Sequence, residues 1–268
     1  MSIAMEAFQN ALEAKRSGQK CPIHGCDKLV YFSLRTKQDE AYCPECQNEQ
    51  LLKMQAEFDQ KASRSINERK FRDNSLVSPK MWACTFDSFV AAPNTREAFM
   101  KHKISRAADA FAAKNTAHNA VLYGQPGAGK SHLAMALMQK VHKESQQTMA
   151  FVNISRLFNK IKNSFEDPTE YWTKEKAIQI MTSVDLLCID DLGTESSMGR
   201  QGQEASRWVQ DVIYDVLENQ DRIIITTNLS DKQLRQVYDS KIFSRIFANS
   251  ANTRFDFSGI SDKRLEGV

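Results

Sequence analysis

The chain of 268 residues contains no long run of apolar residues. A membrane-spanning helix needs about 20 consecutive and mostly apolar residues, so the sequence predicts no transmembrane segment. Residues 1–18 mix acidic and basic side chains without the apolar centre of a secretory signal, and they are typical of a short amphipathic helix. From these absences we expect a soluble, cytoplasmic protein without membrane contact.

Strong charge of one sign is also missing. The chain has 36 Lys and Arg residues against 33 Asp and Glu residues, which gives a formal net charge of +3. A balance this mildly basic permits contact with nucleic acid but does not require it.

Cysteine is scarce, yet four of the six cysteines lie between positions 21 and 46. Because disulfides are rare in the cytosol, this clustering favours a metal site.

The clustered cysteines have the spacing of a zinc site. Two short segments, CPIHGC and CPEC, each offer two ligands separated by two residues, and 18 residues separate His24 from Cys43. Five candidates compete for the four positions of a tetrahedral zinc ion. The proline and glycine of the first segment favour a ligand set with His24, and Cys26 is the alternative to His24. The predicted ligands are Cys21, His24, Cys43 and Cys46, and a closed set of this kind indicates a structural zinc.

Composition changes twice along the chain. Residues 1–50 contain the zinc cluster, and residues 51–80 are polar and highly charged, which predicts a solvated helical linker. The Ser78-Pro79 pair is expected to end this helix. Residues 81–268 have a globular composition. We therefore predict a small N-terminal zinc-binding domain, a linker and a larger C-terminal domain.

In the larger domain, apolar runs alternate with segments of helical periodicity. This alternation predicts a parallel α/β sheet. The predicted strands are 119–123, 148–153, 184–189, 222–227 and 253–257. The predicted helices are 96–113, 131–145, 154–164, 173–183, 201–219, 231–237 and 239–248, and Ser230 or Asp231 is expected to cap the helix at 231–237.

Residues 124–131 read GQPGAGKS, which is the G-x-x-x-x-G-K-[ST] pattern of a phosphate-binding loop. Glycines let successive backbone amides point at phosphate oxygens, and the N-terminus of the next helix attracts negative charge. Lys130 is expected to reach the β- and γ-phosphates of ATP, and Ser131 is expected to hold Mg²⁺. The predicted nucleotide-binding residues are Gly124, Gln125, Pro126, Gly127, Ala128, Gly129, Lys130, Ser131 and His132.

Two later strands end in polar side chains that complete such a site. Asp190 and Asp191 follow the run 184–189, and Asn228 follows the run 222–227. We expect Asp190 to bind Mg²⁺ through water, Asp191 to polarise the attacking water, and Asn228 to contact the γ-phosphate or that water. The alternative for each residue is an ordinary strand end with a cap or turn. Their order behind the phosphate loop favours the catalytic interpretation.

These motifs, with Ser-Arg-Ile at 244–246 and Arg264, resemble in order and spacing the AAA+ ATPases of the DnaC/DnaI helicase-loader group, to which the transposition ATPase IstB is closely related. The resemblance covers about residues 82–268. It implies an AAA+ P-loop NTPase with a five-stranded parallel sheet in the order 5-1-4-3-2. It also implies that Arg245 is an arginine finger for a neighbouring subunit's nucleotide and that Arg264 is a sensor-2 arginine near the γ-phosphate of its own subunit. The alternative for both is a solvated arginine on a helix.

One position departs from the family's usual pattern. The family usually has Asp-Glu at the end of the third strand, whereas this chain has Asp190-Asp191. The carboxylate of Asp191 is one carbon–carbon bond shorter, about 1.5 Å. Misplacement on this scale reduces rates by about a hundredfold. We therefore predict secure nucleotide binding and slow hydrolysis.

Two aromatic residues precede the core of the larger domain. Phe86 and Phe89 lie in a Thr-Phe-Asp-Ser-Phe segment that the resembling family also has just before its ATPase fold. We expect them to pack against the domain, because aromatic residues in apolar stretches are usually buried. The alternative is a place beside the adenine base.

The resemblance also points to DNA. Initiator-type AAA+ proteins have a helical insertion between the second and third strands that contacts single-stranded DNA, and residues 155–165 occupy this place. Arg156, Lys160 and Lys162 offer phosphate contacts, and Phe165 offers a stacking surface for a base. The alternative is an amphipathic helix with a solvated basic face and an apolar face of Leu157, Phe158 and Ile161.

Helicase loaders of the DnaI type carry a zinc-bearing N-terminal domain that binds the replicative helicase, and IstB lacks one. The resemblance therefore implies an ATP-dependent helicase loader, bacterial or phage-encoded, that self-associates through its ATPase domains. Its partners are expected to be a hexameric DnaB-type helicase and single-stranded DNA during replication initiation, and its cofactors ATP, Mg²⁺ and Zn²⁺. One alternative is an IstB-like transposition or DNA-remodelling ATPase, and another is a binding module whose nucleotide is a structural switch without turnover.

Overall fold

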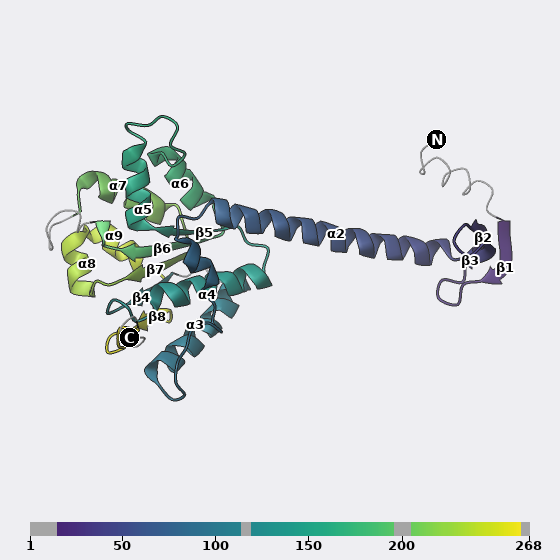
Figure 1. The fold of residues 1–268 in the computed structure, drawn as a ribbon, viewed down its shortest axis with the longest axis horizontal. Helices are drawn as coiled ribbons and strands as arrows, with labels where there is room; N and C mark the ends of the chain where they lie inside the picture. Colours follow the sequence, from purple (N-terminus) through teal and green to yellow (C-terminus); the bar gives the residue numbers. More distant parts are fainter. Residues whose placement is uncertain (1–14, 114–118, 196–204, 264–268) are drawn as a thin grey trace. The chain divides into compact units, whose positions relative to one another are not determined.

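The computed structural model describes residues 15–113, 119–195 and 205–263 (Figure 1). The chain forms two compact units, residues 1–65 and residues 66–268. Among the helices of the described ranges, none combines the length and apolar character needed to cross a membrane.

The first unit contains a small antiparallel sheet. Its strands β1 (Lys15–Lys20), β2 (Asp27–Ser33) and β3 (Gln38–Tyr42) pair in the order β1-β2-β3. The predicted helix at residues 1–18 is wrong over its last four positions, which belong to β1, and residues 1–14 lie outside the described part of the chain. The polar β1 has no alternating apolar pattern, so only its backbone pairing with β2 defines it as a strand.

A long solvated helix, α2 (Pro44–Asp73), follows β3 directly. Proline suits its first turn because no intrahelical N–H donor is needed there. Glu45 in the first turn and Lys70 and Arg72 in the last turn match the helix dipole. Phe71 is the buried residue of this helix, so the helix expected from the charged segment is present and exposed over most of its length.

The second unit is built on a parallel sheet with the strand order β5-β6-β7-β4-β8. Counted from the first strand of this unit, that is the order 5-1-4-3-2, so the predicted α/β AAA+ topology is confirmed. The strands are nearly free of charge before their carboxyl ends because both faces of the sheet are covered. They are β4 (Ala120–Tyr123), β5 (Met149–Asn153), β6 (Leu186–Leu192), β7 (Ile223–Thr227) and β8 (Arg254–Asp256).

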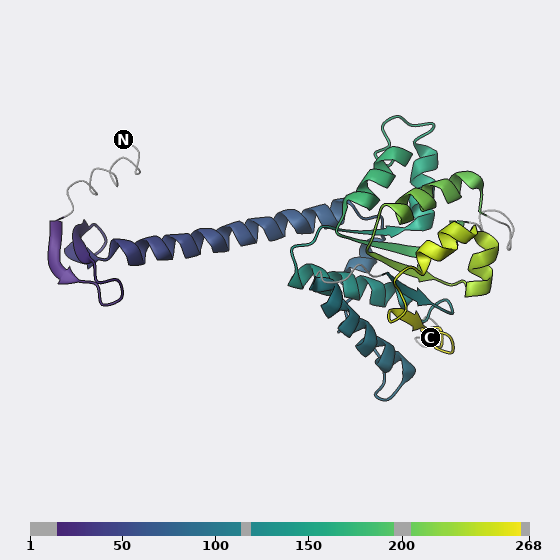
Figure 2. The same cartoon turned by 180° about the vertical axis from the view of Figure 1, so that it is seen from behind.

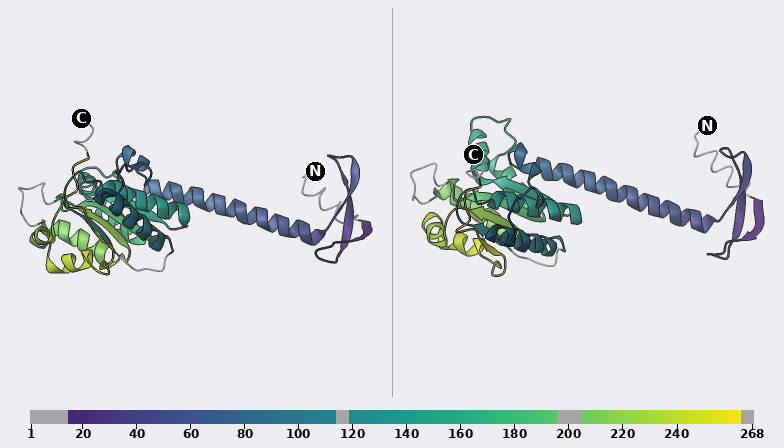
Figure 3. Two further views of the ribbon diagram at one scale, coloured as in Figure 1. Left: turned by 90° about the horizontal axis from the view of Figure 1, so that it is seen from below. Right: turned by 60° about the horizontal axis from the view of Figure 1, so that its bottom comes forward.

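Helices cover both faces of this sheet (Figures 1, 2 and 3). One apolar core contains side chains of α3 and α4, and the other contains side chains of α5 to α9. The helices are α3 (Arg96–Ala112), α4 (Lys130–Glu144), α5 (Ile154–Asn163), α6 (Lys174–Ser183), α7 (Arg207–Glu218), α8 (Asp231–Val237) and α9 (Ser240–Ile246). They agree with the predicted ranges to within a few residues, and residues 201–204 of one prediction lie outside the described residues.

Polar side chains fix where several of these helices begin. Thr95 accepts a hydrogen bond from the amide of Ala98 at the start of α3, and Asn153 accepts one from Arg156 at the start of α5. Ser230 forms a reciprocal capping box with Gln233 at the start of α8, which confirms Ser230 as the cap. Such caps satisfy amides that have no partner within the helix.

The chain between α2 and the core follows the edge of the sheet. Leu76 pairs in parallel with Val152 of β5: its amide donates to Phe151 at 2.9 Å, and its carbonyl accepts from Asn153 at 3.1 Å. A short 3₁₀ helix, η1 (Pro79–Ala83), comes next. The segment before the core is thus hydrogen-bonded to the sheet and positions η1 near the phosphate loop.

Candidate functional site

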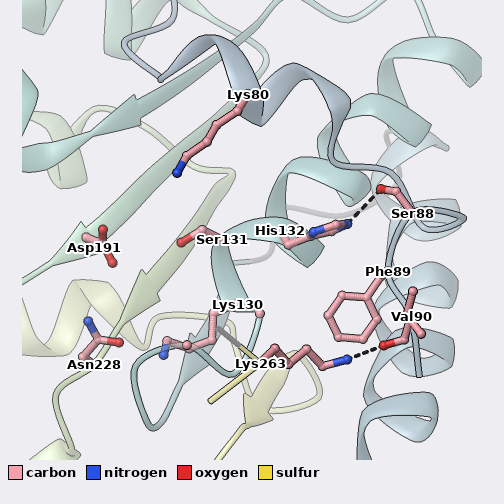
Figure 4. A pocket seen from close by; sticks show the side chains of 12 residues that line it. Lys80, Ser88, Phe89, Val90, Lys130, Ser131, His132, Asp191, Asn228 and Lys263 are labelled. Carbon is pink, nitrogen blue, oxygen red and sulfur yellow. Dashed lines mark hydrogen bonds between the residues drawn. The ribbon is translucent and has the colours of Figure 1, made fainter. Parts of the chain in front are cut away.

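A cavity of about 780 Å³ lies at the carboxyl ends of β6 and β7 (Figure 4). Ligands of open α/β sheets bind at this edge because loops and helix N-termini converge there. Four sources contribute to its walls: the phosphate loop, the ends of β6 and β7, residues 80–90, and the C-terminal segment. The lining residues are Lys80, Ser88, Phe89, Val90, Gly127, Gly129, Lys130, Ser131, His132, Asp191, Asn228 and Lys263.

The phosphate loop has the backbone that its glycines predict. Gly129 immediately precedes α4 with a left-handed φ of 88°, and a Cβ atom there would lie 2.5 Å from Phe89 Cε2. Gly124 has a φ of 132°, and a Cβ atom there would lie 2.7 Å from the backbone of Phe257. Any larger residue at either position would push the loop away from its neighbours.

Lys130 is buried and braces the loop from inside. Its Nζ donates to the carbonyl oxygens of Gly124 at 2.8 Å and Gln125 at 2.7 Å. Four predicted loop residues are not among those that line the cavity: Gly124, Gln125, the exposed Pro126 and the fully buried Ala128. The loop therefore offers the amino end of α4, a lysine ammonium and the Ser131 hydroxyl to one cavity, and this donor set fits a nucleotide phosphate chain with its Mg²⁺.

Asp190 and Asp191 lie in an irregular part of β6. Ile189 pairs with Ile225 and Leu192 pairs with Thr227, so β6 has one residue more than β7 over this stretch. Asp191 takes up the difference with a left-handed φ of 60°. A β-bulge of this kind redirects side chains and is frequent beside active sites.

The bulge gathers both aspartates into one hydrogen-bonded group. Thr226 Oγ1 donates to Asp190 Oδ1 at 2.7 Å and accepts from the Asp191 amide at 2.9 Å. Asn153 Nδ2 donates to Asp190 Oδ2 at 3.3 Å and to Asp191 Oδ2 at 3.2 Å. Asp190 is buried beside the loop, whereas Asp191 lines the cavity opposite Ser131 and near Asn228 (Figure 4). Asp190, Asp191 and Asn228 were predicted from the sequence, whereas Asn153 and the bulge were not.

The rest of the wall combines the predicted His132 with residues that no motif had indicated, among them Ser88, Val90 and Lys263. His132 Nε2 donates to the Thr85 carbonyl at 2.9 Å and lies 3.1 Å from Ser88 Oγ, and burial lowers the pKa of this histidine. Lys263 donates from Nζ to the Val90 carbonyl and lies 4.1 Å from the ring centroid of Phe89. These contacts hold the segment before the core against α4.

The surroundings of Phe89 bear on whether it packs against the domain or lies beside a base. It is buried, it packs against Gly129 and His132, and it also lines the cavity. Phe86 is partly buried against the same core. Packing and a place in the nucleotide cavity are therefore compatible for Phe89.

Of the two predicted arginines, the described part of the chain contains Arg245 alone. Arg245 on α9 forms an ion pair with Glu218, and its guanidinium lies 4.5 Å from the ring centroid of Tyr214. In the described part of the chain, Arg245 is not among the cavity-lining residues. Arg264 lies outside the described residues.

The predicted DNA-binding residues lie on and after α5. Arg156 and Lys160 line a hollow of about 260 Å³ beside residues 75–77. Lys160 pairs with Glu170 at 2.8 Å, and Lys162 is exposed. Phe165 is 66% exposed with its ring 5.9 Å from that of Trp208. The apolar face of α5 is buried as the amphipathic interpretation expected, and DNA binding stays a prediction.

The zinc candidates converge in the first unit. Cys21 Sγ lies 3.8 Å from His24 Nδ1 and 3.7 Å from Cys46 Sγ. His24 Nδ1 lies 3.7 Å from Cys43 Sγ and 3.3 Å from Cys46 Sγ. A tetrahedral zinc with bonds of about 2.3 Å to sulfur and 2.0–2.1 Å to nitrogen has ligand atoms about 3.5–3.8 Å apart. The four side chains therefore fit a zinc ion.

The surroundings favour His24 over Cys26 as the fourth ligand. The four ligand atoms of Cys21, His24, Cys43 and Cys46 lie within 4.8 Å of one another, and this group does not include Cys26. His24 Nε2 lies 3.1 Å from Glu49 Oε1, a partner that would fix the ring with Nδ1 toward the metal. Backbone amides of His24 and Ile23 lower the pKa of Cys21 to about 6, which favours the metal-binding thiolate.

We predict that the purified chain contains about one zinc ion and that a chelator unfolds the first unit, because a core this small is unstable without metal. His24→Ala should lower the zinc content, measured by elemental analysis, whereas Cys26→Ser should leave it unchanged. The opposite pattern, loss with Cys26→Ser and retention with His24→Ala, would contradict the assigned ligand set.

A buried carboxyl group stabilises the turn that follows Asp191. Glu195 accepts hydrogen bonds from the Gly193 amide at 2.9 Å and from the Tyr238 hydroxyl. Thr194 donates to the Asp191 carbonyl from its amide at 3.1 Å and from its hydroxyl at 2.8 Å. Burial raises the pKa of Glu195 to about 7 despite the opposing backbone hydrogen bonds. No sequence pattern indicated this residue, because an acidic side chain in a turn is usually exposed.

This raised pKa predicts a pH-dependent stability. The folded chain favours the protonated carboxyl, so its contribution is fully present below pH 4.5 and is lost as the pH rises to about 7. Glu195→Gln should remove about 3 kcal/mol from the change in the free energy of unfolding over this pH range, since one pKa unit corresponds to about 1.4 kcal/mol. Denaturant titrations at several pH values measure this, and the exposed Glu144→Gln is the control. Equal slopes in both variants would rule out the buried carboxyl as the cause.

The fold and the cavity define the chain as a P-loop ATPase domain of the AAA+ type preceded by a cysteine–histidine unit. The sequence pattern of the IstB-like ATP binding proteins matches residues 56–248. This match spans most of the chain, so the chain belongs to that family.

Known relatives agree with this assignment. The uncharacterized protein YdaV of Escherichia coli is 22% identical over 191 residues, which are 70% of this chain and 71% of that protein. The replicative helicase loader DnaC of Buchnera aphidicola subsp. Acyrthosiphon pisum is 23% identical over 167 residues, 61% of this chain and 63% of the loader. A crystal structure of the DnaC helicase loader superposes with a TM-score of 0.51 at 17% identity, covering 67% of this chain and 99% of that one. The resemblance to this group is confirmed for the family and the fold.

Proposed function

We propose that this chain is an ATP-dependent loader that binds a hexameric DnaB-type helicase and delivers it to single-stranded DNA during replication initiation. The observation that carries the proposal is the combination, on one chain of this family, of a complete phosphate-loop cavity with a separate cysteine–histidine unit. The similarity to proteins named DnaC helicase loader supports it.

In this function the cavity holds Mg·ATP, whose γ-phosphate is the group that hydrolysis transfers to water. The amides from Gly127 to Ser131 and the ammonium of Lys130 would hold the phosphates. Ser131 and Asp190 would hold the metal ion. Asp191 would orient the attacking water and accept its proton, and Asn228 would help to position it.

Other parts of the proposal concern neighbouring molecules. Arg245 would act on the nucleotide of an adjacent copy, and Arg264 on that of its own chain, as a planar fixed charge that stabilises the transferring phosphoryl group. Arg156, Lys160, Lys162 and Phe165 would contact single-stranded DNA. The cysteine–histidine unit would bind the helicase.

Asp191→Asn tests the catalytic assignment directly. Asparagine tolerates the left-handed backbone of this position, so the bulge should persist and nucleotide affinity should be retained. Loss of a general base should lower ATP turnover by about 10²–10⁴-fold. Single-turnover hydrolysis, with and without single-stranded DNA, measures the change.

Asp221→Asn is the matched control, because this exposed aspartate precedes β7 at the opposite end of the strand. Unchanged turnover in Asp191→Asn would remove Asp191 from the reaction. Absence of turnover in the unmodified chain with every partner present would favour a nucleotide switch over an ATPase.

The helicase assignment is tested by gel filtration of the full-length chain with a DnaB-type helicase, ATP and single-stranded DNA. We expect stoichiometric co-elution that Cys43→Ser abolishes, since loss of a zinc ligand unfolds the first unit, and that Cys26→Ser preserves. Co-elution that survives Cys43→Ser would place the helicase contact elsewhere. Failure of the unmodified chain to bind the helicase would favour an IstB-like DNA-remodelling ATPase. The family match, to IstB-like ATP binding proteins, is compatible with this alternative as well.

A further inference from the structure

Lys80 adds a cation to the nucleotide cavity from outside the ATPase motifs. It belongs to η1, which precedes the core, and it lines the cavity together with Ser131 and Asp191. Its side chain extends from η1 over the cavity toward the side where Ser131 and Asp191 lie, whereas Lys263 and Phe89 lie on the other side (Figure 4). Lys80 belongs to none of the sequence motifs.

The position of Lys80 determines which part of a nucleotide it would meet. The side with Asp191 and Asn228 is where the terminal phosphate belongs, because these residues act on the water that attacks it. The side with Phe89 and Val90 offers an aromatic ring and a backbone carbonyl, groups that suit a base. Lys80 therefore faces the terminal phosphate, the part of ATP that ADP lacks.

The other face of η1 is fixed to the end of α2. The ring of Trp82 packs edge-on against Phe71 with centroids 5.0 Å apart, and the guanidinium of Arg72 lies 4.8 Å from the centre of the Trp82 ring. Gln139 on α4 donates to the carbonyl of Trp82 at 2.9 Å and to that of Cys84 at 3.1 Å. A displacement of η1 would therefore be passed to the last turn of α2 and to α4.

We propose that Lys80 contacts the γ-phosphate of bound ATP and that this contact sets the position of η1, and through Trp82 that of the C-terminal turn of α2. The C-terminal turn of α2 then takes a different position with ATP and with ADP, although this turn lies outside every ATPase motif of the sequence. This inference depends on the proposed function only in requiring that the cavity binds ATP.

The first test compares affinities for a non-hydrolysable ATP analogue and for ADP by fluorescence titration of the full-length chain. Lys80→Ala should weaken binding of the ATP analogue about tenfold, the loss expected for one charge-assisted contact, and leave ADP binding unchanged. Lys80→Arg should keep most of the affinity. Lys143→Ala, which removes an exposed lysine from α4, is the control.

The second test measures hydrogen exchange in residues 66–83 with the ATP analogue and with ADP bound. In the unmodified chain we expect slower exchange with the ATP analogue, and in Lys80→Ala the two nucleotides should give the same exchange. Trp82→Ala should keep the affinity difference between nucleotides but lose the exchange difference at residues 66–73.

The outcomes separate this inference from the proposed function. If neither nucleotide binds the unmodified chain, the ATP-binding function itself is wrong. If both bind but Lys80→Ala discriminates ATP from ADP as well as the unmodified chain does, the role of Lys80 is wrong and the function stands. An exchange difference that persists in Lys80→Ala would overturn the coupling.

Discussion

The nucleotide site depends on one extra residue in β6. In a regular strand the side chains of Asp190 and Asp191 would point to opposite faces of the sheet. One of the two carboxylates would then lie in an apolar core and away from the cavity. The bulge, with Asp191 in the left-handed region, lets both carboxylates accept hydrogen bonds from Asn153, while Thr226 donates to the Asp190 carboxylate alone. A non-glycine residue in this conformation costs on the order of 1 kcal/mol. The hydrogen bond from its amide to Thr226 offsets that strain and keeps the backbone in place.

This bulge also changes the argument about the short side chain at position 191. The carboxylate of Asp191 reaches one carbon–carbon bond less far than that of a glutamate only if the backbone at position 191 is the same in both chains. Here the backbone itself turns Asp191 toward the cavity, so reach depends on φ as well as on side-chain length. Sequence spacing cannot show this, because a bulge arises from pairing with β7 and leaves no mark in the pattern of β6.

The parts of the structure that could be predicted from the sequence are those where a local pattern has one physical solution. Buried parallel strands need apolar runs, a phosphate loop needs its glycines, and a zinc site needs its paired ligands. The polar strand β1, the buried Glu195 and the cavity residues Lys80 and Lys263 had no such pattern. Each is defined by its surroundings in the folded chain: β1 by its pairing with β2, Glu195 by Tyr238, Lys263 by the phosphate loop, and Lys80 by its place in the cavity wall. The segment before the core is the clearest case: Phe71 and Lys80 belong to the second unit, where one is buried and the other lines the cavity.

The ion pair of Arg245 bears on the proposed action of this residue in a neighbouring copy. The side chain of Arg245 is 27% exposed and that of its partner Glu218 is 46% exposed, so the pair is a surface interaction. Pairs of this kind contribute roughly 0–1 kcal/mol, and a triphosphate with several negative charges competes with a single carboxylate at little energetic cost. The ring of Tyr214 beneath the guanidinium meanwhile restricts its orientation. The guanidinium also donates to the Lys241 carbonyl and to the Tyr214 hydroxyl, each at 3.2 Å, so several contacts within its own chain hold Arg245 in a defined direction. The proposed action in a neighbour's site requires that the phosphates of the nucleotide replace these contacts.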